Sequence, residues 1–168
     1  MIRDFNGKNP QIAASAFVSE TAYIAGDVEI GENANIWPGA VIRGDIAKIT
    51  IGKNTSIEDN CVVHSATGII IGDNTVVGHG AVVHCKKIGN NVLIGNNATV
   101  LDNAEIEDYC IVAAGSVVAP ETKFPAESLA AGVPAKVKGK LSQEQKDYIT
   151  IASAFNIKLA QKYKKQEL

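Results

Sequence analysis

The three histidines of this chain, His64, His79 and His84, all fall within residues 64–84. Neutral imidazole is a preferred ligand of zinc, and three imidazoles with one open position make the arrangement that a catalytic zinc ion needs. The alternative interpretation is that these histidines are turn residues of a repeat. The choice between the two depends on the elements that position them.

An aliphatic residue recurs every six positions through most of the chain, with two short insertions and one slip of a single residue. Six is a multiple of the two-residue period of a strand and not of the 3.6-residue period of a helix, so the pattern predicts short strands that turn at fixed intervals. All eighteen positions of this aliphatic series are Ile or Val: Ile12, Val18, Ile24, Ile30, Ile36, Ile42, Ile51, Ile57, Val63, Ile71, Val77, Val83, Ile88, Ile94, Val100, Ile106, Val112 and Val118.

A second series of small residues lies four positions after members of the first and shares their inward parity: Ala16, Ala22, Ala34, Ala40, Thr55, Thr75, Ala81, Ala98, Ala104 and Ser116. Large and small inward side chains therefore alternate around a narrow coil. This hexapeptide pattern is typical of an all-β fold, the left-handed parallel β-helix, with three hexads in each triangular coil. We predict about six coils over residues 12–123.

The two ends of the chain depart from the repeat. Residues 1–11 are predicted to be a lead-in, and residues 124–141, with their prolines and glycines, a loop that leaves the coil. Residues 142–168 are predicted to form a C-terminal helix that begins with a capping box of Ser142 and Gln145. We expect one apolar face of this helix to pack back along the β-helix or onto a neighbouring subunit, because four residues share it: Tyr148, Ile151, Phe155 and Leu159.

Composition excludes several classes of partner. The chain has 168 residues with 16 Lys and Arg against 18 Asp and Glu, so no strong field is expected to attract nucleic acid or a membrane surface. No apolar segment is long enough for a signal peptide or a membrane span, which predicts a soluble cytoplasmic protein. Three cysteines without CxxC spacing argue against a disulfide framework or a thiolate zinc site. Cys61 and Cys110 occupy small inward positions, whereas Cys85 lies at a corner beside His84.

Register places the candidate ligands in space. His64 and His84 each directly follow the third aliphatic residue of successive coils, in one column with Arg43 and Leu101. Coils stack at roughly 4.8 Å, so these two imidazoles can bind one ion with Zn–N bonds of about 2.0 Å. His79 belongs to another part of the coil, roughly 15 Å away, so it must reach that ion from another chain. Three-fold packing of subunits would supply it.

Asp59 occupies the position equivalent to His79 one coil earlier. Its carboxylate could orient the His79 imidazole or hold the interface between subunits. A solvated turn carboxylate is the plainer alternative.

Three segments carry a resemblance to a known family: IWPGAVIRGD from Ile36, IGKNTSIEDNCVVH from Ile51 and VVGHGAVVHCKKIGNNVLIG from Val76. The chain resembles the γ-class carbonic anhydrases through these segments, through GVPAK and through the C-terminal helix, over nearly its whole length. The hexads are shared with many acyltransferases, so only the histidine spacing and the Arg43/Asp45 motif discriminate.

The resemblance implies a metal site in a homotrimer, formed by His64 and His84 of one subunit and His79 of the next. It also implies an ion pair between Arg43 and Asp45 at the trimer interface. The metal would be zinc, with iron or cobalt as alternatives, and it would acidify a water molecule that attacks carbon dioxide to give bicarbonate.

The chain departs from the family pattern around this site. Relatives often have Gln where this chain has Glu58, and often a Tyr where the helix has Asn156; we take both residues as candidate catalytic residues. Acidic proton-shuttle residues have no counterpart, because Ile46 follows Asp45 and the loop after His64 is the short SATG. We therefore expect carbon dioxide hydration to depend on exogenous buffer.

Two other functions stay open. One is a hexapeptide acyltransferase that uses an acyl-CoA thioester and a histidine general base, although such enzymes usually carry a long projecting loop and the insertions here are short. The other is a structural trimer subunit that has lost its chemistry. A metal analysis and a hydration assay would separate the three.

Overall fold

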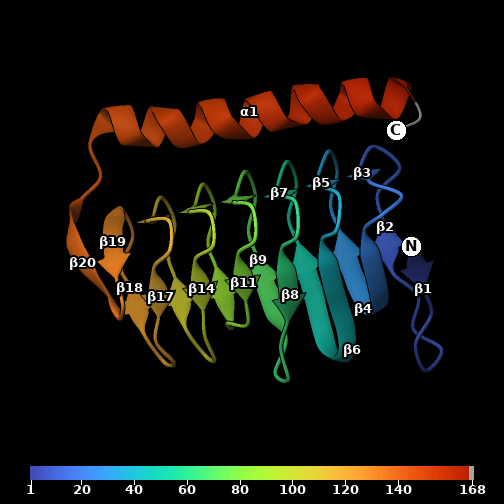
Figure 1. Ribbon diagram of the computed structural model, residues 1–168, viewed down its shortest axis with the longest axis horizontal. Helices are drawn as coiled ribbons and strands as arrows, with labels where there is room; N and C mark the ends of the chain where they lie inside the picture. Colours follow the sequence, from blue (N-terminus) through green and yellow to red (C-terminus); the bar gives the residue numbers. More distant parts are fainter. Residues whose placement is uncertain (167–168) are drawn as a thin grey trace.

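The computed structural model describes residues 1–166 and forms a parallel β-helix with one long helix along its side (Figure 1). Short strands stack into three sides, and each side takes one strand from each successive coil. The prediction of a hexapeptide β-helix with a C-terminal helix is confirmed.

The first side, here called the helix face, contains seven parallel strands and one antiparallel strand at its edge. Since each coil contributes one parallel strand to it, the β-helix has about seven coils and not six. Its strands are β3 (Phe17–Val18), β5 (Asn35–Ile36), β7 (Ser56–Ile57), β10 (Val76–Val77), β13 (Leu93–Ile94), β16 (Ile111–Val112), β19 (Ser128–Gly132) and the antiparallel β20 (Ala135–Lys140).

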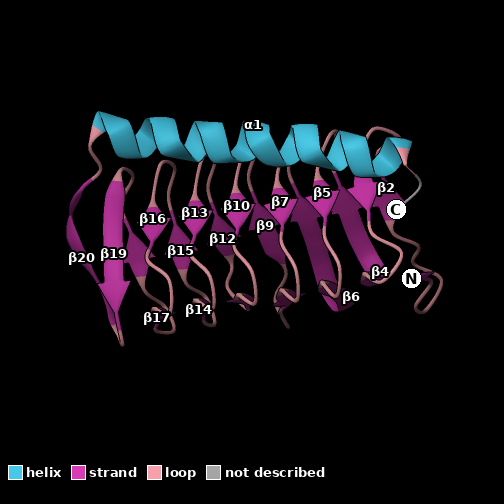
Figure 2. Ribbon diagram, turned by 45° about the horizontal axis from the view of Figure 1, so that its top comes forward, coloured by secondary structure: helices cyan, strands magenta, loops and turns pink. Residues whose placement is uncertain are grey.

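The other two sides share two long strands, β4 (Tyr23–Ile30) and β6 (Val41–Ile51), which continue around the corner and join them into one twelve-stranded sheet (Figure 2). The second side, here called the valine face, consists of the first parts of β4 and β6 with β1 (Ile2–Arg3), β8 (Val62–His64), β11 (Val82–Val83), β14 (Thr99–Val100) and β17 (Val117–Val118). The third side, here called the charged face, consists of the second parts of β4 and β6 with β2 (Gln11–Ile12), β9 (Ile69–Ile71), β12 (Lys87–Ile88), β15 (Glu105–Ile106) and β18 (Lys123–Phe124).

The aliphatic series lies inside the coils, as its parity predicts. Ile12 and Val18, in the first coil, are half-buried and pack against the core, and the later members from Ile24 to Val118 are buried. Every member of the small-residue series is buried as well. Cys61, Cys85 and Cys110 are free thiols in this interior, and burial raises the pKa of Cys61 and Cys85 to about 12. All three cysteines are therefore core residues.

The domain boundaries predicted at the two ends need correction. Residues 124–141 are not a simple loop, because they contain β19 and β20 and complete a further coil. Phe124 and Ala130 continue the six-residue series inside that coil and are buried, but neither is Ile or Val, so the pattern seemed to end early. At the other end, β1 lies within residues 1–11 and pairs in parallel with β4. The lead-in therefore adds a strand to the valine face.

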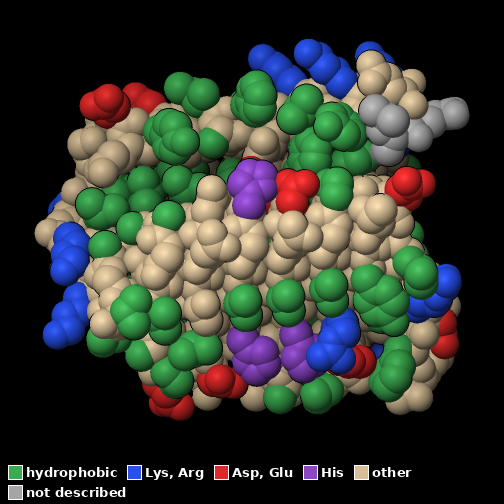
Figure 3. Space-filling model, viewed as in Figure 1, with side chains coloured by type: hydrophobic (Ala, Val, Ile, Leu, Met, Phe, Trp, Pro, Cys, Tyr) green, Lys and Arg blue, Asp and Glu red, His purple; other side chains and the backbone are tan. Residues whose placement is uncertain are grey.

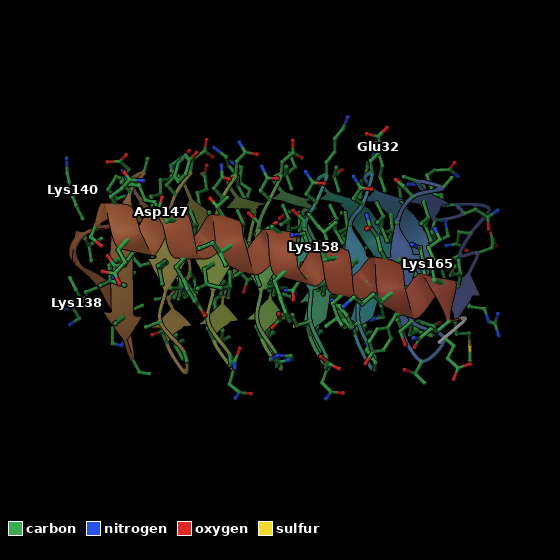
Figure 4. The ribbon with its side chains drawn as sticks, turned by 90° about the horizontal axis from the view of Figure 1, so that it is seen from above. Glu32, Lys138, Lys140, Asp147, Lys158 and Lys165 are labelled. Atoms are coloured by element: carbon green, nitrogen blue, oxygen red, sulfur yellow. The ribbon has the colours of Figure 1, made fainter. Side chains whose placement is uncertain are left out.

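The helix α1 (Gln143–Lys165) begins at the predicted capping box, in which the Ser142 side chain accepts from the Gln145 amide and the Gln145 side chain accepts from the Ser142 amide. It lies along the helix face, contacting β3, β5, β7 and β10. Seen from above, the helix crosses the stack of coils from Asp147 near its start to Lys165 at its end (Figure 4). Residues 167–168 of the predicted helix lie outside the described part.

The predicted apolar face of α1 does not pack on the chain's own coils, so of the two alternatives only packing onto a neighbouring subunit stays a prediction. Its buried residues are Ile149, Ser153, Asn156 and Ala160, whereas Tyr148, Ile151 and Phe155 are exposed. Of the four residues predicted to form the packing face, Leu159 alone packs inward, against a cluster of Phe17, Trp37 and Ala160. In this chain the helix therefore keeps most of its apolar stripe on the outside. Among residues 1–166, no helix has the length and hydropathy needed to cross a membrane.

Candidate metal centre

His64 and His84 stand on neighbouring coils at the edge between the valine and charged faces. Val63 and Val83 are paired in register, and His64 and His84 each follow directly. The two imidazole rings lie 5.4 Å apart between centroids and are tilted by 51°. On the coil before, Arg43 pairs with His64 in register. The column predicted from the repeat is thus present in the fold.

Asp45 holds one side of the His64 ring. Its Oδ1 lies 3.0 Å from His64 Nε2, and its Oδ2 accepts from Arg43 of the same chain. Partial burial raises the pKa of Asp45, but the Arg43 charge and the His64 hydrogen bond outweigh it and leave that pKa below its ordinary value. The predicted Arg43–Asp45 ion pair is thus present within the chain, where it orients His64, and its place at a trimer interface stays a prediction.

Asp102 holds the His84 ring in a similar way and was not predicted from the sequence. Its Oδ1 lies 3.1 Å from His84 Nδ1. Asp102 lies on the coil after His84 but one position past Leu101, which is the residue equivalent to His84 in the repeat. A search restricted to equivalent positions, which selected Asp59, therefore does not reach Asp102.

His79 lies at the opposite edge of the valine face, in the turn between β10 and β11. Its Nδ1 is 2.9 Å from Asp59 Oδ2, which is the contact predicted for Asp59. Its Nε2 is 3.1 Å from Glu58 Oε2. The other oxygen of Glu58 accepts a hydrogen bond of 2.8 Å from Asn156 Nδ2, so helix α1 reaches this half of the site.

The three imidazoles do not meet within one chain. Figure 3 shows the histidine side chains in two groups, a pair beside basic and acidic side chains and a single one nearer the helix. Within the described residues, no cluster of three His, Cys, Asp or Glu side chains is arranged to hold a metal ion. Each chain therefore carries two separate histidine groups, one at each edge of the valine face, which are called half-sites below.

The donor chemistry of these half-sites suits a metal such as zinc. Metal-binding histidines usually give one ring nitrogen to the metal and the other to a carboxylate or carbonyl oxygen, which fixes the ring. Asp45, Asp59 and Asp102 supply such a carboxylate to each of the three histidines. The cysteines are buried in the core and offer no competing thiolate.

Family models match most of the repeat. Residues 9–44 and 86–120 match the bacterial transferase hexapeptide model (six repeats), and residues 48–85 match the hexapeptide repeat of succinyl-transferase. These models describe the β-helix and are shared by proteins of several activities.

Individual relatives are more specific. The chain is 44% identical to a carbonic anhydrase of Geobacillus kaustophilus over 146 residues, which are 86% of this chain and 80% of that protein. It is 40% identical to the mitochondrial gamma carbonic anhydrase 2 of Arabidopsis thaliana over 92% of this chain, and it spans 58% of that longer protein. Among solved structures, a candidate acetyltransferase of Bacillus cereus superposes with a TM-score of 0.96 at 36% identity, over 99% of this chain and 98% of that one.

The β-helix fold, the positions of the three histidines and the sequence identity over most of the chain all point to the same family. The chain belongs to the γ-carbonic-anhydrase-like family of hexapeptide-repeat proteins.

Proposed function

We propose that this protein is a homotrimeric, metal-dependent carbonic anhydrase that interconverts carbon dioxide and bicarbonate at sites shared between subunits. One observation carries the proposal: three imidazoles, each held by a carboxylate, are divided between the two edges of the valine face. Neither half-site is sufficient for a catalytic zinc, which needs three protein ligands.

The valine face has the character of a subunit interface. One row of outward positions, running from β4 to β17 and paired in register from coil to coil, is uncharged and mostly apolar, while Arg43 lies at the edge of this face. Apolar side chains repeated along one solvent-facing side are typical of a surface that binds a partner. The outward residues are Tyr23, Val41, Val62, Val82, Thr99 and Val117.

The levels of the coils agree with a ring of three subunits. Rotation about an axis parallel to the β-helix keeps each coil at its own height. His79 and His84 belong to the same coil, and His64 lies one coil away, at a spacing of roughly 4.8 Å. A neighbour's His79 would therefore arrive level with the His64/His84 pair. A closed ring repeats this contact between unlike edges, so every subunit contributes to two sites.

Zinc is the metal that this ligand set favours, with iron and cobalt as alternatives. Bound there, it would supply the acidification of water to a pKa of about 7, which provides a nucleophile for carbon dioxide at neutral pH. His64, His79 and His84 would hold it, and Asp45, Asp59 and Asp102 fix their ring orientations.

Glu58 and Asn156 have separate roles in this proposal. Glu58 is 14% exposed in its side chain and lies against His79, so its carboxylate can accept a hydrogen bond from the attacking water. Asn156 donates to the other Glu58 oxygen and positions it. A carboxylate in place of the amide found in relatives also gives this chain a proton acceptor at Glu58 Oε2.

The alternative function is a hexapeptide acyltransferase that uses an acyl-CoA thioester. The similarity to a candidate acetyltransferase favours it. Such acyltransferases usually carry a long projecting loop, and this chain has none at the two interruptions of the repeat. One interruption lies within the continuous strand β6, and the other forms a short turn between β8 and β9. A structural trimer without chemistry is the third candidate. Tightly held metal together with hydration activity would exclude both alternatives.

A subunit-mixing experiment tests the shared site directly. His64→Ala and His79→Ala should each abolish metal binding in a pure trimer, because every site loses one ligand. When the two variants are denatured, mixed equally and refolded, a site is whole only if the His79→Ala chain supplies the His64/His84 pair and the His64→Ala chain supplies His79. Random assembly makes about a quarter of the sites whole.

Metal content of the refolded trimers, measured by elemental analysis, is the readout. The wild-type protein, refolded in parallel, should hold about one divalent ion per chain. Mixed trimers that recover no metal would reject the shared site.

A further inference from the structure

Two large apolar side chains stand exposed beside the two half-sites. Ile46 is 63% exposed and directly follows Asp45, whose carboxylate contacts His64. Phe155 is 64% exposed and directly precedes Asn156, which donates to Glu58 beside His79. Each of these exposed residues is thus adjacent in sequence to a residue whose side chain orients one half-site of the proposed metal centre.

The surface around Phe155 is hollowed. A cavity of about 270 Å³ lies between α1 and the coils, lined by Trp37, Pro38, Glu58, His79 and Phe155 among others. A second cavity of about 400 Å³ lies on the other side of His79, with Leu93, Ile111 and Tyr148 in its walls. The surface on both sides of His79 is therefore recessed and lined by apolar and polar side chains together, as a surface that receives the corner of another molecule can be.

Ile46 and Phe155 also lie at similar heights along the axis of the β-helix. Ile46 follows Ile42, and the coil of Ile42 also contains Trp37 and Pro38. Phe155 shares its cavity with Trp37 and Pro38 of that coil and with Glu58 of the next. A rotation that keeps coil heights therefore places Ile46 of one subunit level with Phe155 of the next, on the outer side of the contact between their edges.

We infer that Ile46 of each subunit packs against Phe155 of the neighbouring subunit and that this contact forms an apolar rim over the shared metal centre. The inference rests on the proposed function, and the partner is a second copy of this chain. It accounts for the exposure of Phe155, one of the apolar residues of α1 that the chain's own coils leave uncovered. An apolar rim admits a small uncharged molecule such as carbon dioxide and places no acid or base at this point of the entrance.

Cysteine cross-linking tests the contact. In the Ile46→Cys/Phe155→Cys double variant, mild oxidation should link neighbouring chains and produce covalent dimers and trimers on a non-reducing gel. A short bismaleimide extends the test to thiols just beyond disulfide reach. The native cysteines should not react with the oxidant or the bismaleimide, because Cys61, Cys85 and Cys110 are buried.

The matched control is Ile70→Cys combined with Phe155→Cys. Ile70 is 60% exposed, close to the value for Ile46, but it points outward from the charged face. This control should remain uncross-linked. If wild-type trimers hold metal and the Ile46→Cys/Phe155→Cys variant also forms trimers without cross-linking, the rim contact is wrong while the proposed function stands. If the wild-type protein forms no trimer, the proposed function itself fails.

A second pair of variants tests the same contact in case the double cysteine variant does not fold. Ile46→Asp and Phe155→Lys should each lower the urea concentration at which the trimer dissociates, and the double variant should recover part of the loss by forming an ion pair. Losses that simply add would overturn the contact.

Discussion

The valine face and the charged face are built on one inward repeat of buried apolar residues and differ most in the side chains that point outward. On the valine face these are Tyr23, Val41, Val62, Val82, Thr99 and Val117, and on the charged face Gln11, Glu29, Thr50, Ile70, Lys87, Glu105 and Lys123. The charged face carries ion pairs between coils, such as Lys48–Glu29 and Lys87–Glu107. The difference teaches that inward positions determine the coil, whereas outward positions determine what the coil can bind.

The largest expected difference between the two faces is in assembly. Val62→Lys places a charge at the centre of the proposed interface, where an unpaired buried charge costs roughly 3–5 kcal/mol and weakens association more than about a hundredfold. Ile70→Lys places the same charge on the charged face and should leave assembly unchanged. Sedimentation velocity should find monomers for the first variant and trimers for the second. Equal behaviour of the two variants would remove the valine face as the interface.

A smaller effect is expected at the edge of the valine face, in catalysis. Hydration should rise with the concentration of a small buffer base, because Ile46 takes the place of an acidic residue at the entrance. Glu58→Gln should keep the metal and lower kcat by roughly a hundredfold or more, because an amide cannot accept the proton. Glu107→Gln, on the charged face, is the control and should match the wild type. Stopped-flow rates that do not change with buffer would show that a protein group carries the proton out.

The smallest effect is expected on the charged face. Hydrogen bonds from Lys123 and then Lys86 hold the pKa of Glu105 below its ordinary value of 4.5. A carboxyl with a lowered folded pKa stabilises the protein above its unfolded pKa, and this contribution is lost as the pH falls through the folded pKa. Glu105→Gln should therefore melt slightly below the wild type at neutral pH.

That gap should close on acidification through the range just below 4.5. It should also shrink in high salt, because these pairs face solvent. Melting curves at several pH values and salt concentrations check both statements. A gap that persists at low pH would mean that Glu105 acts through packing and not through its charge.

Most of the fold could be predicted from the sequence, because inward parity repeats every six residues and each coil repeats the same local geometry. The prediction stopped one coil short, since Phe124 and Ala130 fill inward positions with side chains outside the Ile/Val series. The helix was predicted with its capping box but not with its packing face. Hydropathy predicted that Tyr148, Ile151 and Phe155 form the packing face. The residues that pack on the coils are instead those that are small enough for close approach or that hydrogen-bond to a polar partner. Ser153 Oγ, for example, donates to the Asn54 carbonyl oxygen at 3.0 Å.

Part of the candidate site was equally accessible from the sequence. The repeat places His64 and His84 on neighbouring coils and separates them from His79, and both features hold in the fold. The carboxylate of Asp102 was missed because it lies one position past Leu101, the residue equivalent to His84 on the next coil. The placement of the Arg43–Asp45 pair within one chain required the side-chain geometry.

The sequence by itself determined the coil, the level of each histidine and the uncharged row of side chains along the valine face, because all three follow from positions counted along a regular repeat. Tertiary structure alone decided how α1 lies on the coils. Asn156 and Glu58 are 98 residues apart in the chain, and no period relates the helix to the repeat. Their hydrogen bond, the two cavities beside His79 and the exposure of Phe155 depend on how a helix of period 3.6 rests on coils of period six, which is settled by packing between them.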